Sequence, residues 1–101
     1  MIGNTLRLLR RIHGKTIKEL SNELGVSSSF ISAIEHNKRN PSLSLLEKYA
    51  DSFGIRLNGL LFFYEEIRDD DSKGFFEKNS RPLFLKAIKT LEKITEHESQ
   101  E

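Results

Sequence analysis

The chain has 101 residues, 37% of them hydrophobic and 31% charged, with a formal net charge of +1. This length suits one small core with an appended element, and we do not expect a second full domain. The lack of cysteine excludes disulfides and thiolate metal sites. No apolar run reaches the roughly 18 residues that a membrane span needs. We therefore expect a cytoplasmic protein without membrane contact.

The charge is unevenly distributed along the chain. Residues 1–41 hold seven Lys or Arg against three acids, whereas residues 69–101 hold six against eight. A basic first part and a mildly acidic tail indicate that only the first part faces an anion, although an ordinary mixed surface would explain the same balance.

Apolar residues recur at three- and four-residue spacing, which predicts an all-α fold with no competing strand pattern. Thr16 and Glu19 have the spacing of a capping box, and Gly25 suits a left-handed residue between two helices. The expected helices cover residues of about 6–12, 17–24, 28–36, 43–53, 59–68 and 82–97, and the first five are capped by Asn4 or Thr5, Thr16, Ser27, Ser42 and Asn58.

The chain changes character after Arg68. We expect one compact domain over residues 1–68, a charged linker over 69–81, and an amphipathic C-terminal helix within 82–101. This helix could fold back on its own domain or pair with a second copy, and we favour dimerisation or partner binding. The residues expected at such a contact are Phe62 and Phe63 in a long apolar run, and Phe84, Ile88 and Leu91 on the C-terminal helix.

The second and third expected helices, joined by a short turn with Gly25, have the arrangement of a helix-turn-helix motif. The segment "TIKELSNELGVSSSFISAIEHNKRNPSLSLLEKYADSFGI" resembles the phage repressor and Cro-type (Xre-like) helix-turn-helix regulators, and the resemblance covers residues 4 to about 62. It implies a five-helix, lambda-repressor-like domain that binds double-stranded DNA. The third helix would then lie in the major groove.

The resemblance also assigns roles to individual residues. Arg10 and Glu35 match a buried ion pair of the family. Ile17 stands where the family commonly has Gln, so we expect a phosphate contact there that is weaker or shared with Lys15 and Lys18. The base-facing positions are Ser28, Ser29, Ser32 and Ala33, and the phosphate-contacting positions are Thr16, Ile17, Lys18, Lys38, Arg39 and Asn40.

The base-facing side chains are unusually short. Serine discriminates bases poorly and alanine offers at most a methyl contact, so specificity should depend substantially on DNA shape, ordered water or longer side chains at the rim.

We therefore expect a sequence-specific transcriptional regulator, most simply a repressor that binds an inverted-repeat operator as a homodimer. The alternatives are a protein-interaction module that binds an anti-repressor or another protein, and the antitoxin of a toxin–antitoxin pair. No enzyme activity, cofactor or metal site is expected, because no catalytic or ligand constellation has the required spacing.

Overall fold

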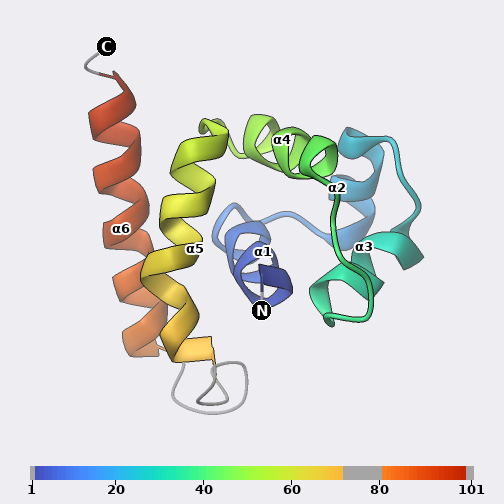
Figure 1. The fold of residues 1–101 in the computed structure, drawn as a ribbon, viewed down its shortest axis with the longest axis horizontal. Helices are drawn as coiled ribbons and strands as arrows, with labels where there is room; N and C mark the ends of the chain where they lie inside the picture. The colour runs from blue at the N-terminus through green and yellow to red at the C-terminus, as the bar shows by residue number, and fades with distance from the viewer. Residues whose placement is uncertain (1, 72–80, 100–101) are drawn as a thin grey trace.

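The computed structural model describes residues 2–71 and 81–99, with side chains described for 2–68 and 85–96. These residues form six helices and no strand, which confirms the predicted all-α class. Figure 1 shows α1 in the middle, with the α2–α3 pair on one side, α5 and α6 on the other, and α4 across one end. The helices are α1 (Ile2–Ile12), α2 (Ile17–Leu24), α3 (Ser28–Glu35), α4 (Leu43–Ser52), α5 (Leu57–Asp71) and α6 (Arg81–Ser99).

One apolar core joins all six helices. The central helix α1 buries Leu6, Leu8 and Leu9, so it contacts α3 on one side and α5 on the other. Full burial of one such side chain contributes about 1.5–3 kcal/mol. The other buried members of this core are Leu20, Leu24, Ile31, Ile34, Leu45, Tyr49, Ala50, Phe53, Ile55, Leu60, Phe63, Ile67, Ala87 and Ile94.

Helix α1 begins earlier than its sequence predicts. The expected N-caps Asn4 and Thr5 lie inside the helix, which starts at Ile2. The reason is a cap supplied through space, since the amide of Gly3 donates to Asn37 Oδ1 at 3.1 Å and Asn37 Nδ2 donates to Asn4 Oδ1 at 3.1 Å. Because the capping side chain is 34 residues away, the local sequence could not reveal this start.

Helix α5 also differs from the prediction at both ends. The amide of Leu60 bonds to the carbonyl of Arg56, so the helix is already under way at Leu57 and Asn58 is not its cap. Helix α5 then continues to Asp71, through the first part of the predicted linker 69–81, and residues 72–80 lie outside the described part of the chain.

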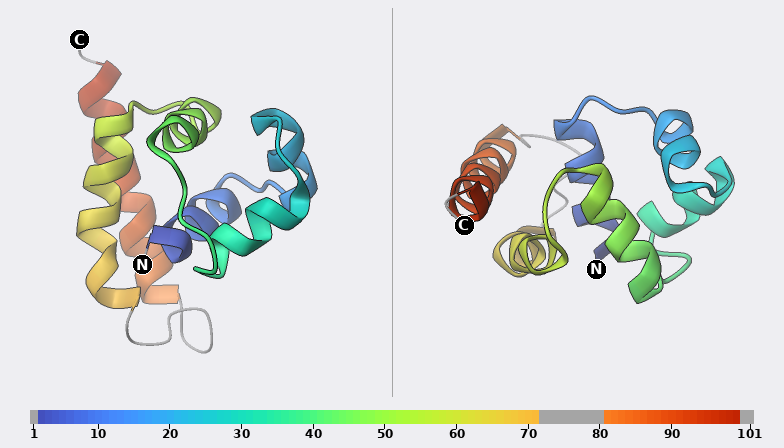
Figure 2. Two further views of the ribbon diagram at one scale, coloured as in Figure 1. Left: turned by 45° about the vertical axis from the view of Figure 1, so that its right-hand side comes forward. Right: turned by 90° about the horizontal axis from the view of Figure 1, so that it is seen from above.

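Helix α6 packs against α5 of the same chain. Its Ala87 and Ile94 side chains are buried in the same core as Ile67 of α5. Figure 2 shows the two helices side by side in both views. Within residues 2–71 and 81–99, no helix combines the length and the apolar character needed to cross a membrane.

Candidate nucleic-acid interface

The α2–α3 pair is fixed by caps at both helix starts. Thr16 Oγ1 accepts from the amide of Glu19 at 3.0 Å while Glu19 Oε1 accepts from the amide of Thr16 at 2.8 Å, which completes the predicted capping box. Gly25 ends α2 with a φ of 72°, a left-handed conformation that costs glycine nothing. Ser27 then caps α3 through a 3.1 Å bond from the amide of Phe30. These caps set the angle at which α3 leaves the turn.

Helix α3 carries the four predicted base-facing residues on one outward side. Ser28 and Ser29 are exposed, and Ser32 and Ala33 are half-buried, while Ile31, Ile34 and Glu35 point into the protein. The four side chains are all short, so a DNA groove could approach the helix backbone closely at these positions.

The serine hydroxyls on this side already have partners within the protein. Ser28 Oγ lies 3.1 Å from Ser21 Oγ of α2, and Ser29 Oγ lies 3.2 Å from Ser27 Oγ. Ser32 Oγ lies 3.5 Å from His36 Nδ1, a long contact. The His36 ring also bonds the Ser32 carbonyl at 2.8 Å, which requires the proton on Nδ1. The Ser21 contact was not foreseen, because Ser21 is a buried residue of another helix.

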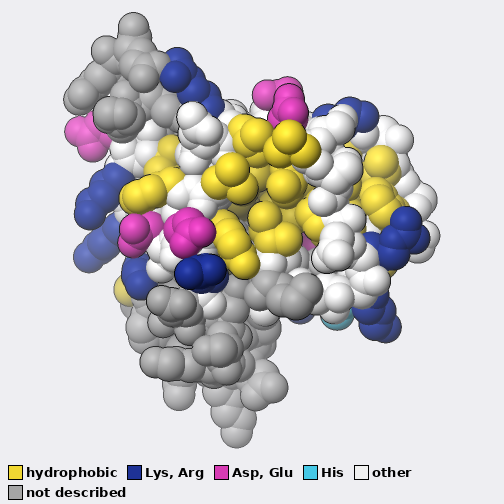
Figure 3. Space-filling model, viewed as in Figure 1, with side chains coloured by type: hydrophobic (Ala, Val, Ile, Leu, Met, Phe, Trp, Pro, Cys, Tyr) yellow, Lys and Arg dark blue, Asp and Glu magenta, His cyan; other side chains and the backbone are white. Residues whose placement is uncertain are grey.

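The loop after α3 carries the exposed cluster Lys38, Arg39 and Asn40. Asn37 opens this loop with a φ of 62°, a left-handed conformation that asparagine adopts more readily than most residues. The amides of Lys38 and Arg39 both bond to the carbonyl of Ala33, at 2.8 and 3.3 Å, which holds the loop against the end of α3. Figure 3 shows basic side chains at the edge of the molecule where α3 lies.

Arg39 does not extend freely from this loop. Its guanidinium carbon lies 5.1 Å from the centre of the half-buried Phe30 ring, within cation–π range. Phe30 therefore belongs to the candidate interface, although its sequence position indicates only an apolar residue of α3. No local pattern links two residues nine positions apart, so the fold was needed to find it.

The start of α2 offers fewer contacts to an anion than the sequence suggested. Thr16 and Lys18 are exposed and Ile17 is half-buried, but the capping box already uses both the amide and the hydroxyl of Thr16. The hydrogen bonds from Thr16 lower the pKa of the Glu19 carboxyl, which therefore holds a negative charge at this helix start. This charge opposes an incoming phosphate and leaves Lys18 as the exposed basic residue of α2.

Lys15 is turned away from this surface. Its Nζ donates at 2.9 Å to Glu23 Oε1, to the Ser52 carbonyl and to Ser52 Oγ. The expectation that Lys15 shares the phosphate contact at Ile17 is therefore wrong in this structure. Lys15 instead ties the α1–α2 loop to α2 and α4.

Arg10 and Glu35 form the ion pair that the sequence predicts. Arg10 Nε donates to Glu35 Oε2 at 2.7 Å and Nη2 donates to Oε1 at 3.0 Å, while Nη1 donates to the Lys15 carbonyl at 2.8 Å. The two side chains are 12% and 1% exposed. Burial and the nearby Glu35 carboxylate both raise the pKa of the Tyr49 hydroxyl. The pair joins the end of α3 to α1 and so fixes the orientation of α3.

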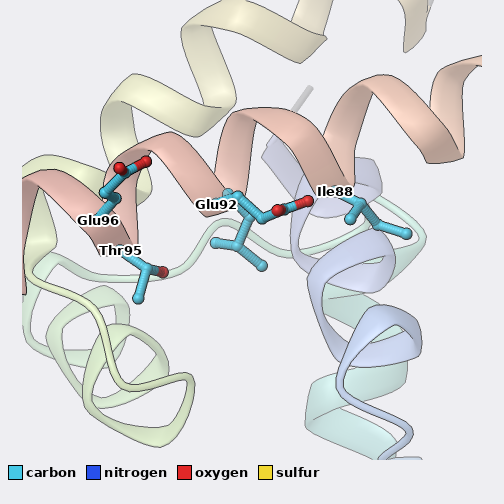
Figure 4. A pocket seen from close by; sticks show the side chains of 5 residues that line it. Ile88, Glu92, Thr95 and Glu96 are labelled. Atoms are coloured by element: carbon cyan, nitrogen blue, oxygen red, sulfur yellow. The ribbon is translucent and has the colours of Figure 1, made fainter.

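The residues predicted to meet a partner are separated by the fold. Phe62 is 49% exposed on α5, whereas Phe63 is fully buried in the chain's own core, so the prediction of a partner contact at Phe63 is wrong here. The side chain of Phe84 lies outside the described residues. Ile88 and Leu91 are half-buried and line a shallow depression on α6 together with Glu92, Thr95 and Glu96 (Figure 4).

Comparisons with known proteins place this architecture in a family. The family model described as "Helix-turn-helix domain" matches residues 3–66. An uncharacterised HTH-type transcriptional regulator of Methanocaldococcus jannaschii is 41% identical over 63 residues, which cover 62% of this chain and 94% of that protein. The regulator SinR of Bacillus subtilis is 36% identical over 62 residues, which cover 60% of this chain and 56% of SinR. The chain thus spans nearly all of the first relative but little more than half of the second.

Two solved structures of SinR agree with the sequence comparison. SinR in complex with DNA superimposes with a TM-score of 0.56 at 35% identity, covering 60% of this chain and 98% of that chain. The complex of SinR with SinI gives a TM-score of 0.56 at 29% identity, covering 88% and 95%. The chain belongs to the helix-turn-helix family of transcriptional regulators.

Proposed function

We propose that this protein is a sequence-specific, double-stranded DNA-binding transcriptional regulator that acts as a repressor. The observation that carries the proposal is the exposed side of α3, which presents only short side chains beside the exposed cations Lys38 and Arg39. Such a helix can enter the major groove closely while a neighbouring cation such as Lys38 binds the backbone. The solved complex of SinR with DNA supports this role.

The interface divides into two kinds of contact. Ser28, Ser29, Ser32 and Ala33 face the bases, whereas Lys18, Lys38 and Asn40 contact phosphates, together with the α2 start at Thr16 and Ile17. Because the hydroxyls on α3 are already partnered by Ser21, Ser27 and His36, a substantial part of the specificity comes from DNA shape. Changes at central, uncontacted base pairs of the operator should therefore alter affinity markedly.

The repressor acts as a homodimer on an inverted repeat. Two-fold operators match two-fold proteins, with half-sites about 10 base pairs apart or a multiple of that spacing. The adjoining exposed side chains Leu61 and Phe62 of α5 support an apolar contact between two copies, because contiguous exposed apolar surface often marks an interaction site.

The first experiment is selection of sheared genomic DNA by the purified protein at ~150 mM salt, a concentration at which non-specific binding is weak. Enrichment of one inverted repeat is expected. Ser29→Asp should abolish the enrichment, because it places a carboxylate against the DNA.

Ser44→Asp is the matched control. Ser29 and Ser44 are both exposed and both occupy the second position of their helices, α3 and α4, so the two changes are equally tolerable to the fold. Only Ser29 lies on the side of α3 that is proposed to face the bases, here called the reading side and formed by Ser28, Ser29, Ser32 and Ala33. If a folded wild-type protein enriches no sequence, or if both variants behave alike, the proposed DNA reading is wrong.

A protein-binding role is the second candidate, and one observation favours it. The match to the SinR–SinI complex covers 88% of this chain, which is too much to be contained in residues 2–71 and therefore extends into α6. Salt dependence separates the two functions: with four to eight neutralised phosphates, log K falls with log salt at a slope of about −0.9 per phosphate. A module that binds only protein would show no such slope with DNA.

A further inference from the structure

The reading side of α3 lacks the side chains that best distinguish one base from another. Direct readout relies on forked groups such as arginine, which forms two hydrogen bonds to guanine O6 and N7. On α3, Ala33 has no polar group, and Ser28 and Ser29 are engaged with Ser21 and Ser27. Any forked reader must therefore come from outside the helix.

Arg39 is a forked side chain that lies beside α3. Its amide bonds to the Ala33 carbonyl at 3.3 Å, so its backbone lies at the end of α3, while its guanidinium reaches back to Phe30 near the start of the helix. Phe30 and Ala33 are three residues apart and so adjoin on the helix surface, which places the guanidinium of Arg39 beside this part of α3.

The contact of Arg39 with Phe30 is a cation–π contact and not a hydrogen bond, so it does not use the N–H groups of the guanidinium. Restraint by the ring also lowers the entropy lost when the fork binds a planar acceptor. Lysine, a compact charge without a fork, could not use the same platform in this way.

We propose that Arg39 reads a guanine of the operator in the major groove and that Phe30 is the positioning residue that holds its guanidinium beside α3. The sequence resemblance had assigned Arg39 to phosphate; the contact with Phe30 instead places it with the reading helix. This inference rests on the proposed DNA-binding function and names a residue that decides which sequence is bound.

The test measures binding to the selected DNA fragment and to copies in which one guanine at a time is replaced by 7-deazaguanine, which lacks N7. The wild-type protein should lose affinity on the order of tenfold at one guanine per half-site. Arg39→Lys keeps the charge and should lose that discrimination, while its affinity for unrelated DNA stays within about twofold.

Variants of Phe30 test the positioning role. Phe30→Tyr keeps an aromatic face and should retain the discrimination, whereas Phe30→Leu keeps only apolar bulk and should reduce it. Lys38→Ala serves as the control for a neighbouring exposed cation and should weaken binding to all fragments alike. Circular dichroism of each variant establishes that the helices are intact.

Each outcome supports or overturns the inference. Arg39→Lys that still discriminates at the same guanine, or that weakens all fragments equally, shows that Arg39 does not read bases. If Arg39→Lys loses discrimination but Phe30→Leu does not, the positioning role of Phe30 is wrong. A wild-type protein that prefers no DNA sequence contradicts the proposed function itself, which separates that failure from failure of this inference.

Discussion

At the scale of single residues, the contact between Arg10 and Glu35 determines how firmly α3 is held against α1. Arg10→Ala leaves a carboxylate that is 1% exposed without its cation, and breaking such a buried pair costs about 3–5 kcal/mol. We expect a lower midpoint in urea denaturation and a correspondingly lower melting temperature.

Arg10→Lys is the informative companion to that variant. Lysine keeps the charge but cannot donate to both Glu35 oxygens and to the Lys15 carbonyl at once, so an intermediate loss of stability is expected. A melting temperature of Arg10→Ala equal to that of the wild type would show that the pair adds nothing to stability.

The ionisation of Glu23 gives a residue-level prediction of pH dependence. Hydrogen bonds from Lys15 and Ser52 hold the pKa of the Glu23 carboxyl below its ordinary value. A carboxyl with a lowered pKa stabilises the fold above its unfolded pKa, and this contribution is lost as the pH falls through the folded pKa. The wild type should therefore melt above Glu23→Gln at pH 7, and the difference should disappear in strong acid.

Glu47→Gln on the exposed side of α4 is the control for this pH series, since it removes one carboxylate outside the contact of Lys15 with Ser52. Its melting temperature should follow that of the wild type at every pH. A constant difference between Glu23→Gln and the wild type across the series would contradict the role of the Glu23 charge.

Single residues also show what a sequence can and cannot predict. The Glu35 charge on the apolar side of a helix requires a partner, and the family resemblance supplied Arg10 for it. Two contacts could not be predicted from the sequence: the hydrogen bond from Lys15 to Ser52 and the contact of Arg39 with the Phe30 ring. Both depend on side chains that only the tertiary fold brings together.

At the scale of helices, the start of α1 depends on a close approach to the end of α3. A Cβ atom added to Gly3 would lie 2.2 Å from the Ile34 carbonyl oxygen and 2.5 Å from Asn37 Oδ1. Because a backbone atom must move to make room, Gly3→Ala should destabilise the protein by about 1–3 kcal/mol, although alanine is the better helix former. Thermal unfolding measures this loss.

Asn37→Gly is the matched test of the same contact. Glycine tolerates the φ of 62° at this position but removes the side chain that caps Gly3 and bonds to Asn4. We expect destabilisation of about 1 kcal/mol, typical of a lost N-cap. If Gly3→Ala proves more stable than the wild type, helix propensity outweighs the close packing of α1 against α3.

Helix boundaries were predictable only where the caps are local. The bounds of α2 match the prediction because Thr16, Glu19 and Gly25 adjoin the helix that they cap. The start of α1 was missed because its cap comes from Asn37, and the start of α5 was missed because Leu57 packs against the core ahead of the apparent cap Asn58.

At the scale of the whole molecule, the contact of α6 with α5 makes the C-terminal helix part of the single core. An amphipathic stripe shows that a helix has an apolar side but does not name what covers it, and so dimerisation and fold-back remained open in the sequence. The structure covers part of the stripe, at Ala87 and Ile94, within the same chain. Dimerisation through the remaining half-buried residues Ile88 and Leu91 stays a prediction.

A pair of charge substitutions on α6 tests this packing. Ala87 is fully buried and Leu85 is 49% exposed. Ala87→Glu should lower the melting temperature strongly because it buries a carboxylate between two helices, whereas Leu85→Glu should leave it nearly unchanged. Equal effects of the two variants would mean that α6 does not pack on α5 as described.

The exposed Phe62 of α5 tests the proposed dimer. This ring is 49% exposed, so Phe62→Glu should leave the fold intact, while a charge in an apolar contact between two copies should weaken their association. Sedimentation velocity should show a dimer for the wild type and a monomer for Phe62→Glu, with unchanged circular dichroism. Leu43→Glu places the same charge on a residue of α4 that is 60% exposed and should remain dimeric. Because one monomer occupies a single half-site, Phe62→Glu should also lose most of its preference for the inverted repeat over an isolated half-site. If Phe62→Glu is still a dimer, the contact at Phe62 is wrong. The contact between copies would then be sought on α6, by substituting Ile88 and Leu91.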